Sequence, residues 1–323
     1  MKREKILLAH GGGGELTGKL IDDHILAKLG VENSAPLLDS AVFPPMQGSL
    51  CMTTDSFTVQ PLFFPGGDIG RLALCGTIND LAMLGAEIRG ISMALIIEEG
   101  LEICVLDEIL DSMAAVCQEA GVSIVTGDTK VVEHSRGDGL IVNTAGLGEQ
   151  TRELSLGFDS IEAGDQIIVN GALAEHGLAV MSAREDLSFS TSIKSDVAPL
   201  NTLVKRILDT GAELKFMRDP TRGGLAGVAQ DICDACGSSV EIYEDALPID
   251  AAVRHTSEML GLDPLTVANE GKVLFVVSER DCGKVIDACR EHALGQDAAI
   301  IGRISDARPP LVELLTSIGG RRL

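Results

Sequence analysis

The sequence predicts a two-domain α+β protein whose N-terminal half is organised like an α/β domain. Its 323 residues exceed the ~150 that one domain usually needs. Short β-branched runs alternate with apolar residues at helical spacing up to about residue 150. A polar, glycine-containing stretch over 149–164 then interrupts this alternation. We therefore expect domains over residues 1–150 and 151–323.

The N-terminal domain is expected to contain four strands and two long helices. Runs rich in β-branched residues predict strands near 50–54, 88–97, 122–127 and 140–147. Apolar residues at helical spacing predict helices over 69–84 and 106–120, and Gly121 ends the second helix. Residues 6–9 form an apolar, strand-like start to the chain.

The C-terminal domain is expected to mix the same two kinds of element. Apolar runs predict strands near 166–170, 239–243, 265–268, 272–278, 298–303 and 311–315. Helical spacing predicts helices near 174–184, 196–209, 223–235, 250–260 and 282–292.

Charge and aromatic content exclude nucleic acid as a partner. The chain has 26 lysines and arginines against 48 aspartates and glutamates, which gives a net charge of −22. Phosphodiester backbones and anionic lipid surfaces would repel such a chain. One tyrosine and no tryptophan leave little for stacking on bases.

Neither a membrane span nor a disulfide framework is predicted. Apolar runs stay far below the ~20 residues that a spanning helix needs, and the N-terminus lacks a secretory signal pattern. We therefore expect a cytoplasmic protein. Cys233 and Cys236 form a C-x-x-C pair just before Gly237, as at the end of a helix. Without a second ligand pair, a place in the core is favoured over metal or redox chemistry.

A run of four glycines, Gly11, Gly12, Gly13 and Gly14, is the first candidate site. Four glycines let backbone N–H groups surround an anion, because no Cβ blocks the approach. No Gly-Lys-Ser/Thr follows, so the run is not a Walker motif. A flexible linker explains the glycine content equally well.

Three aspartates follow strands or lie in a helix of the N-terminal domain. Asp55 and Asp128 come near the ends of apolar strands, and Asp80 follows Asn79 in an apolar helix. Carboxylate oxygens at such positions are typical ligands of Mg²⁺. A hydrogen bond between helices is the alternative explanation for Asp80. If the three carboxylates converge, their mutual repulsion predicts a metal–phosphate site.

Two further motifs lie in the C-terminal domain. In the stretch 218–224, Thr221 is a candidate helix N-cap, and an ordinary capped helix explains it and Asp219. Arg222 with two following glycines favours a phosphate site instead. In the stretch 269–272 a turn explains the asparagine and glycine, whereas Glu270 has no obvious structural task.

The order of these motifs resembles the HypE family of hydrogenase maturation factors, the carbamoyl dehydratases, over nearly the whole chain. The wider superfamily resembles aminoimidazole ribonucleotide synthetase, selenophosphate synthetase and thiamine monophosphate kinase. The motifs are Ala9-His-Gly-Gly-Gly-Gly14, Thr54-Asp-Ser-Phe57, Pro61-Leu-Phe-Phe-Pro-Gly-Gly-Asp-Ile-Gly70, Cys75-Gly-Thr-Ile-Asn-Asp80, Thr126-Gly-Asp-Thr-Lys-Val-Val132, Asn143-Thr-Ala-Gly146, Asp219-Pro-Thr-Arg-Gly-Gly224 and Asn269-Glu-Gly-Lys272.

The resemblance implies a PurM-like fold and a specific reaction. N-terminal sheets of two chains would join into a barrel across a homodimer, and ATP would drive dehydration of a carboxamide carried on a C-terminal cysteine. The product is a thiocyanate destined for the cyanide ligands of [NiFe]-hydrogenase. HypF would supply the carbamoyl group, and a HypC–HypD complex would take the product.

The resemblance also implies residue roles. Lys130 and Glu270 would be catalytic, supplying the base for the amide N–H, while Asp55, Asp80 and Asp128 would hold Mg²⁺ and phosphates. The nucleotide would contact Gly11, Gly12, Gly13, Gly14, Asn79, Thr129, Asp219, Arg222, Gly223 and Gly224.

The end of the sequence departs from the family pattern. That pattern continues beyond residues 319–323 to a tail finishing in Pro-Arg-Ile-Cys, whereas the sequence here stops at Leu323. We expect the tail to be omitted or truncated, because every other motif is intact. Two alternatives stay open: another ATP-dependent kinase or synthetase of the superfamily, and a non-catalytic docking member of the maturation complex.

Overall fold

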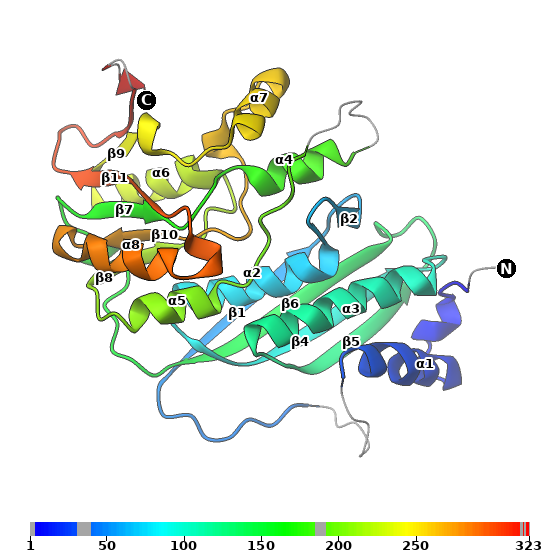
Figure 1. Cartoon of the computed structure of the whole chain (residues 1–323). Helices are drawn as coiled ribbons and strands as arrows, with labels where there is room; N and C mark the ends of the chain where they lie inside the picture. Colours follow the sequence, from blue (N-terminus) through cyan, green and yellow to red (C-terminus); the bar gives the residue numbers. More distant parts are fainter. Residues whose placement is uncertain (1–3, 31–39, 185–191, 317–318, 320, 323) are drawn as a thin grey trace. The chain divides into compact units, whose positions relative to one another are not determined.

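The computed structural model describes residues 4–30, 40–184, 192–316, 319 and 321–322 (Figure 1). The chain divides into two compact units. Unit 1 comprises Met1–Leu81 and Ala86–Thr151, and unit 2 comprises Ala82–Gly85 and Arg152–Leu323. Each unit has its own sheet. Among the described helices, none is both long and apolar enough to cross a bilayer.

Unit 1 is built on a four-stranded sheet. The strand order is β1 (Ser49–Phe57), β6 (Leu140–Gln150), β4 (Glu87–Glu98) and β5 (Ile124–Val132). Neighbours are antiparallel except β4 and β5, which are parallel and joined by helix α3 (Ile103–Ala120). Helices α2 (Ile69–Met83) and α3 lie together on one face of the sheet (Figure 1). A small hairpin of β2 (Phe63–Phe64) and β3 (Gly67–Asp68) precedes α2.

The two faces of this sheet differ in burial. Ile91, Met93, Leu95 and Ile97 of β4 are at most 3% exposed, because they pack under the helices. The alternate residues point to the other side, which we call the open face. It carries hydrophobic side chains with large exposed fractions: Leu50 63%, Met52 74% and Ile96 37%.

Local hydrogen bonds fix the helix ends in unit 1. The Asp68 carboxylate accepts the N–H of Gly70 at 2.7 Å and of Arg71 at 3.1 Å, so it satisfies the first free donors of α2. Helix α3 ends at Gly121, which adopts a left-handed φ of 67°. The predicted end of this helix is therefore confirmed.

The described chain begins with a short extended stretch, in which Lys5 forms an antiparallel bridge with Glu102 and the Ile6 N–H donates to the Leu101 carbonyl at 2.8 Å. Short helical segments follow it. They are η1 (Leu8–Gly11), α1 (Glu15–Lys19) and the π-helical η2 (Leu20–Leu26). A hydrogen bond and an ion pair join the residues up to Lys28 to α3: His24 Nδ1 lies 2.7 Å from Asp107, and Lys28 Nζ lies 2.7 Å from Asp111. The strand-like start predicted over 6–9 is thus reduced to one bridge and an extended Leu7, because Leu8 already belongs to η1.

Unit 2 is built on a seven-stranded sheet with helices on both faces. The strand order is β13 (Arg321–Arg322), β12 (Val312–Leu315), β9 (Ser239–Tyr243), β11 (Ala299–Ser305), β7 (Gln166–Val169), β10 (Leu274–Val277) and β8 (Leu214–Arg218). Helix α6 (Gly224–Cys236) packs on Ile167 and Val276, whereas α5 (Asn201–Leu208) and α8 (Cys282–Arg290) pack on Ile168 and Phe275. Burial on both faces explains why these strands read as continuous apolar runs.

A third apolar cluster joins helices α4 (Glu175–Ser182) and α7 (Ala251–Leu260) to Val267. The strand predicted near 265–268 is wrong: Pro264–Thr266 is a 3₁₀ turn, because the Asp263 carboxylate accepts the N–H of Leu265 at 3.0 Å. Strand β8 was not predicted, since it has only five residues and a lysine interrupts its apolar run.

Candidate functional site

A cavity in unit 1 brings the glycine run to strand β5. It has a volume of about 470 Å³, and its polar wall includes Gly11, Gly13, Asp128 and Thr129. Its opposite wall is apolar, formed by Ile21, Ile25, Leu26 and Leu29. Two motifs far apart in the sequence thus line one space: the glycine run, and the part of β5 that carries Asp128 and Thr129. Such a combination of apolar residues with a few polar groups is typical of small-molecule sites.

The four glycines, which we call the glycine loop, have different structural tasks. A Cβ on Gly11 would lie 2.8 Å from the backbone nitrogen of Val131, so only glycine lets the loop touch β5. Gly13 has a φ of +77°, and its N–H donates to Thr17 Oγ1 at 2.9 Å. A Cβ on Gly14 would meet nothing within 4 Å. Thr17, which the sequence analysis did not single out, therefore helps to shape the loop.

We expect Gly11→Ala to destabilise the protein and Gly14→Ala to be nearly neutral in the same assay. The added methyl at position 11 must push the loop away from Val131, which costs roughly 1–3 kcal/mol, as overpacking usually does. Position 14 has room and a negative φ of −96°. Urea unfolding of both variants measures the difference. Equal midpoints would show that loop and strand do not pack as described.

The three predicted aspartates do not converge within one chain. Asp55 on β1 and Asp128 on β5 lie on opposite edge strands of the sheet. Asp55 pairs in register with Thr144, whose hydroxyl is hydrogen-bonded to Thr77 of α2, so Asp55 lies on the helix-covered face. Asp128 is in register, through Ala94 of β4, with Asn143, and it lies on the open face. The predicted meeting of three carboxylates in one domain is therefore corrected. Among described residues, no group of three His, Cys, Asp or Glu side chains is placed to hold a metal ion.

Asp80 has a structural partner in this arrangement. Thr53 Oγ1 of β1 donates to Asp80 Oδ2 at 2.6 Å, which joins α2 to the sheet. The sequence left open that Asp80 makes a hydrogen bond between two helices instead of binding a metal ion. The observed hydrogen bond is of this structural kind, but it joins a helix to a strand. Asn79 beside it is 1% exposed. Both residues lie on the helix-covered side of the sheet.

Lys130 lies on the open face with Asp128. The two residues are two positions apart on β5, so their side chains leave the strand on the same side. They pair in register with Ile96 and Ala94 of β4. Thr129 between them points to the other side. The predicted catalytic lysine and one predicted metal ligand are therefore neighbours on one strand.

In unit 2 the loop 219–224 leads from β8 into α6. Gly223 and Gly224 have left-handed φ values of 73° and 60°, and Gly223 is the helix N-cap. The prediction that Thr221 caps this helix is wrong, because the left-handed glycine occupies that position. Arg222 is exposed and Asp219 is half-buried on this loop.

The stretch Asn269–Lys272, which we call the Glu270 turn, lies against this loop. Asn269 Nδ2 donates to the carbonyl of Pro220 at 3.0 Å, and Asn269 Oδ1 accepts the N–H of Ala174 at 2.7 Å. A Cβ on Gly224 would come 2.6 Å from the carbonyl oxygen of Val267. The structure thus brings together the two motifs of unit 2. Glu270 belongs to unit 2 and Lys130 to unit 1.

The sequence analysis missed a buried ionic cluster behind the Glu270 turn. Lys272 Nζ lies 3.0 Å from Asp196 and 3.6 Å from Glu175. Burial raises the pKa of Glu175, against the opposing effect of Lys272, and burial lowers the pKa of His176. Asp196 and Glu270 are far apart in the sequence, so no spacing pattern could have paired them.

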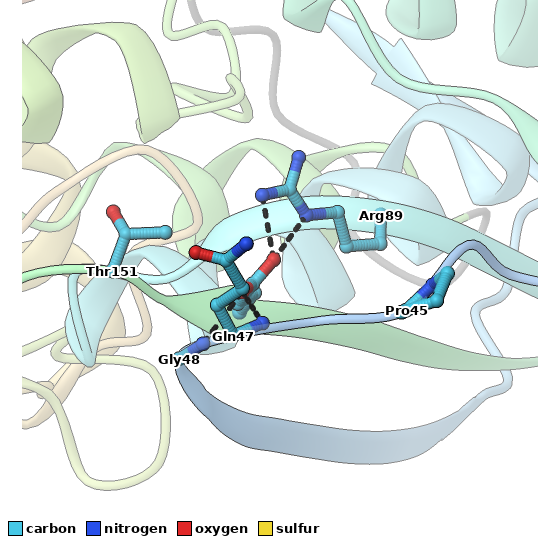
Figure 2. Close-up of a pocket in the computed structure, with 6 residues that line it drawn as sticks. Pro45, Gln47, Gly48, Arg89 and Thr151 are labelled. Atoms are coloured by element: carbon cyan, nitrogen blue, oxygen red, sulfur yellow. Dashed lines mark hydrogen bonds and ion pairs between the residues drawn. The ribbon is translucent and has the colours of Figure 1, made fainter.

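A second cavity in unit 1, of about 510 Å³, surrounds another carboxylate that the sequence did not reveal (Figure 2). Glu149, 5% exposed, accepts the N–H of Gln47 at 2.6 Å and of Gly48 at 2.7 Å. Arg89 donates to the same carboxylate through Nε at 3.0 Å and Nη2 at 2.7 Å. These donors, the two backbone groups first, hold the pKa of Glu149 below its usual value.

This lowered pKa gives Glu149 a pH-dependent share of stability. A carboxylate with a depressed pKa in the folded state stabilises the protein above its unfolded pKa and loses that effect as pH falls through the folded value. We expect Glu149→Gln to unfold at lower urea than the parent at pH 7, with the gap closing toward pH 3. Glu87→Gln, at a largely exposed neighbour of Arg89, is the control. A pH-independent gap would contradict the assignment.

Two family models match the chain in sequence: AIR synthase related protein, N-terminal domain, over residues 38–150, and AIR synthase related protein, C-terminal domain, over residues 162–311. Together with the two sheets described above, they define the protein as an AIR synthase related protein with the PurM-like fold. Within this class the chain belongs to the HypE family. Carbamoyl dehydratase HypE of Bradyrhizobium diazoefficiens is 44% identical over 98% of this chain and 92% of its own.

Solved structures agree with this assignment. The hydrogenase maturation protein HypE in complex with ATP superposes with a TM-score of 0.89, 40% identity and coverage of 98% of this chain and 96% of that one. HypE in the HypE–HypF complex gives a TM-score of 0.81 at 42% identity, covering 96% of this chain and 99% of that one. The predicted family is therefore confirmed, and so is the two-domain PurM-like fold, whereas the barrel across a dimer stays a prediction.

Proposed function

We propose that this protein is an ATP-dependent carbamoyl dehydratase of hydrogenase maturation. The observation that carries the proposal is the cavity between the glycine loop and β5, whose lining includes Asp128 and Thr129. Its support from the comparisons is the 44% identity to a carbamoyl dehydratase HypE and the likeness to HypE solved with ATP. A general small-molecule kinase or synthetase fits this identity less well.

The reaction proposed balances as an ATP-coupled dehydration. A carboxamide on a C-terminal cysteine, R–S–CO–NH₂, reacts with ATP to give R–S–CN, ADP and inorganic phosphate. The amide oxygen is a poor leaving group until it carries the phosphoryl group, and the N–H protons then leave to a base. We assign the proton-accepting step to Glu270 and Lys130. Domains over 1–150 and 151–323 would supply one of these residues each.

The nucleotide contacts are proposed from the same geometry. Backbone N–H groups of the glycine loop would face the phosphates beside Thr129, while the loop of Asp219, Arg222, Gly223 and Gly224 offers a cation and a helix start. Asn79 stays a candidate contact on the helix-covered side. Each of these roles stays a proposal.

Magnesium would accompany the triphosphate. Mg²⁺ is usually bound through one or two carboxylates plus substrate phosphates, so the dispersed aspartates suit it better than a three-carboxylate cage would. Asp128 is the candidate beside the glycine loop, and Asp55 and Asp80 are candidates on the other side of the sheet. When bound, the ion would neutralise charge on the phosphates.

We further propose a homodimer through the open face of unit 1. Leu50, Met52 and Ile96 are strongly exposed there, and a second copy of the sheet would cover them and close a barrel. HypF is the proposed source of the carbamoyl group, supported by the solved HypE–HypF complex. A HypC–HypD complex is the proposed acceptor, and the cytoplasm the proposed location.

An oxygen label tests this function against its rivals. A version of the chain that carries a C-terminal cysteine S-carboxamide labelled with ¹⁸O is incubated with ATP. We expect loss of one water from the protein mass and one ¹⁸O in the released phosphate, because the amide oxygen leaves on phosphorus. ADP release with no change in protein mass would favour another kinase or synthetase. No ADP release at all would favour a docking protein.

A further inference from the structure

We propose that the buried carboxylate of Asp196 is a positioning residue that fixes the Glu270 turn and so aims the Glu270 side chain. This inference rests on the proposed catalytic role of Glu270. Asp196 lies outside every motif used to recognise the family in the sequence. Its assignment comes from contacts within unit 2 alone.

One carboxylate holds three consecutive residues. Asp196 Oδ1 accepts the N–H of Glu270 at 3.2 Å, and Oδ2 accepts the N–H of Gly271 at 3.1 Å. Oδ2 also lies 3.0 Å from Lys272 Nζ. The Asp196 side chain is 1% exposed, so water does not compete for these contacts. A buried carboxylate is retained only when such donors compensate its lost hydration.

The Glu270 N–H, the Gly271 N–H and the Lys272 ammonium are all donors, so an acceptor-only carboxylate suits this position. An asparagine of the same shape would turn an NH₂ group toward at least one of these donors. Glu175, 3.6 Å from Lys272, adds a second carboxylate on the far side of the lysine. Lys272 is thereby held between two anions.

The rest of the turn is fixed from the other side. Asn269 is bonded to Pro220 and to Ala174, which has a left-handed φ of 70° directly before α4. A Cβ on Gly271 would lie 1.8 Å from the carbonyl oxygen of Asp196, so the two backbones are in direct contact. With both flanking residues held, the backbone direction at Glu270 is set.

The segment that carries Asp196 is itself anchored. Ser195 Oγ lies 2.8 Å from His176 Nδ1 and accepts the N–H of Val197 at 3.1 Å. His176 is 7% exposed on α4. The carboxylate therefore projects from an ordered segment onto the turn, which is what a positioning role requires.

Two readouts on Asp196→Asn test the proposal, one of them independent of catalysis. We expect amide hydrogen exchange at Glu270 and Gly271 to become at least about 10-fold faster, and kcat for dehydration to fall about 10-fold with KM for ATP unchanged. Asp281→Asn is the matched control. Asp281 is also buried, accepts the N–H of Glu213 at 2.9 Å and pairs with Lys284 at 2.7 Å, but it follows strand β10, whereas the Glu270 turn precedes that strand. It should leave both readouts unchanged.

A double variant separates positioning from general stability. In the Glu270→Gln background, adding Asp196→Asn should lower the residual rate no further, because its effect passes through Glu270. The same 10-fold loss in both backgrounds, or unchanged amide exchange in Asp196→Asn, would overturn the proposal. Full activity of Glu270→Gln would instead overturn the proposed catalytic role of Glu270, while the exchange data still decide whether Asp196 holds the turn.

A second pair of variants serves if Asp196→Asn does not fold. Lys272→Met removes the ammonium from the cluster, and Lys272→Arg keeps a positive charge there. We expect faster exchange at Glu270 and Gly271 and a rate loss in the first, with recovery of at least half of both effects in the second. Equal behaviour of the two variants would count against the ionic hold on the turn.

Discussion

Glu270→Gln is expected to lower the rate of carboxamide dehydration by about 10²–10⁴-fold, the usual share of a general base. Glutamine keeps the size of the side chain but cannot take up a proton. The Glu270 turn is held by Asn269 and Asp196, so the substitution of Glu270 by glutamine should not disturb the backbone. Single-turnover mass spectrometry of the carboxamide-bearing protein gives the rate.

ATP affinity is the companion measurement for this variant. Calorimetric titration should give a dissociation constant within about twofold of the parent, because the side chain is assigned to proton transfer and not to binding. A salt-bridge role would give a different pattern: reduced unfolding temperature with an unchanged dehydration rate. That pattern would remove Glu270 from the mechanism.

Asp128→Asn is expected to reduce ATP turnover by about 10²–10³-fold, the loss typical when one group that stabilises transition-state charge is removed. Asp128 lines the cavity beside the glycine loop, and its side chain is exposed in unit 1. Loss of its charge should therefore affect phosphate chemistry far more than folding. Release of ADP at saturating Mg²⁺ and ATP measures the effect.

Two further aspartates sharpen this result. Asp138→Asn, on the loop after β5, is the control and should turn over ATP like the parent. Asp55→Asn addresses the opposite edge of the sheet, on its helix-covered side. If Asp55→Asn were inactive and Asp128→Asn active, the phosphates would bind on that side and not beside the glycine loop.

Local pattern was enough for most of the fold. The helix expected over 106–120 begins three residues earlier, at Ile103, and ends at Gly121 as expected, since a periodic apolar stripe and a terminal glycine are both local signals. The strand predicted near 265–268 is wrong because an aspartate and a proline form a 3₁₀ turn within this apolar run. The periodicity of apolar residues gives no sign of a single side-chain hydrogen bond such as that from the Leu265 N–H to Asp263.

The site was less accessible to sequence reasoning. The glycine loop and Asp128 could be recognised one at a time, but strand order decides which aspartates are neighbours. Asp55 lies on the edge strand β1 and Asp128 on the other edge strand β5, with β6 and β4 between them. The spacing of the two residues in the sequence gives no sign of this separation. Asp196 illustrates the same limit, because a carboxylate in an irregular segment gives no signal until the fold brings it to the turn.

The end of helix α2 has a practical consequence for work on the separate halves of this protein. Ala82 and Met83 are buried with Leu203, Val204 and Ile207 in the core of unit 2, although they precede β4 in the chain. A fragment starting at residue 152 would leave a hole in that core and expose its apolar lining. Such a fragment should bind hydrophobic dyes and aggregate, and it would regain solubility only when 82–85 are supplied as well.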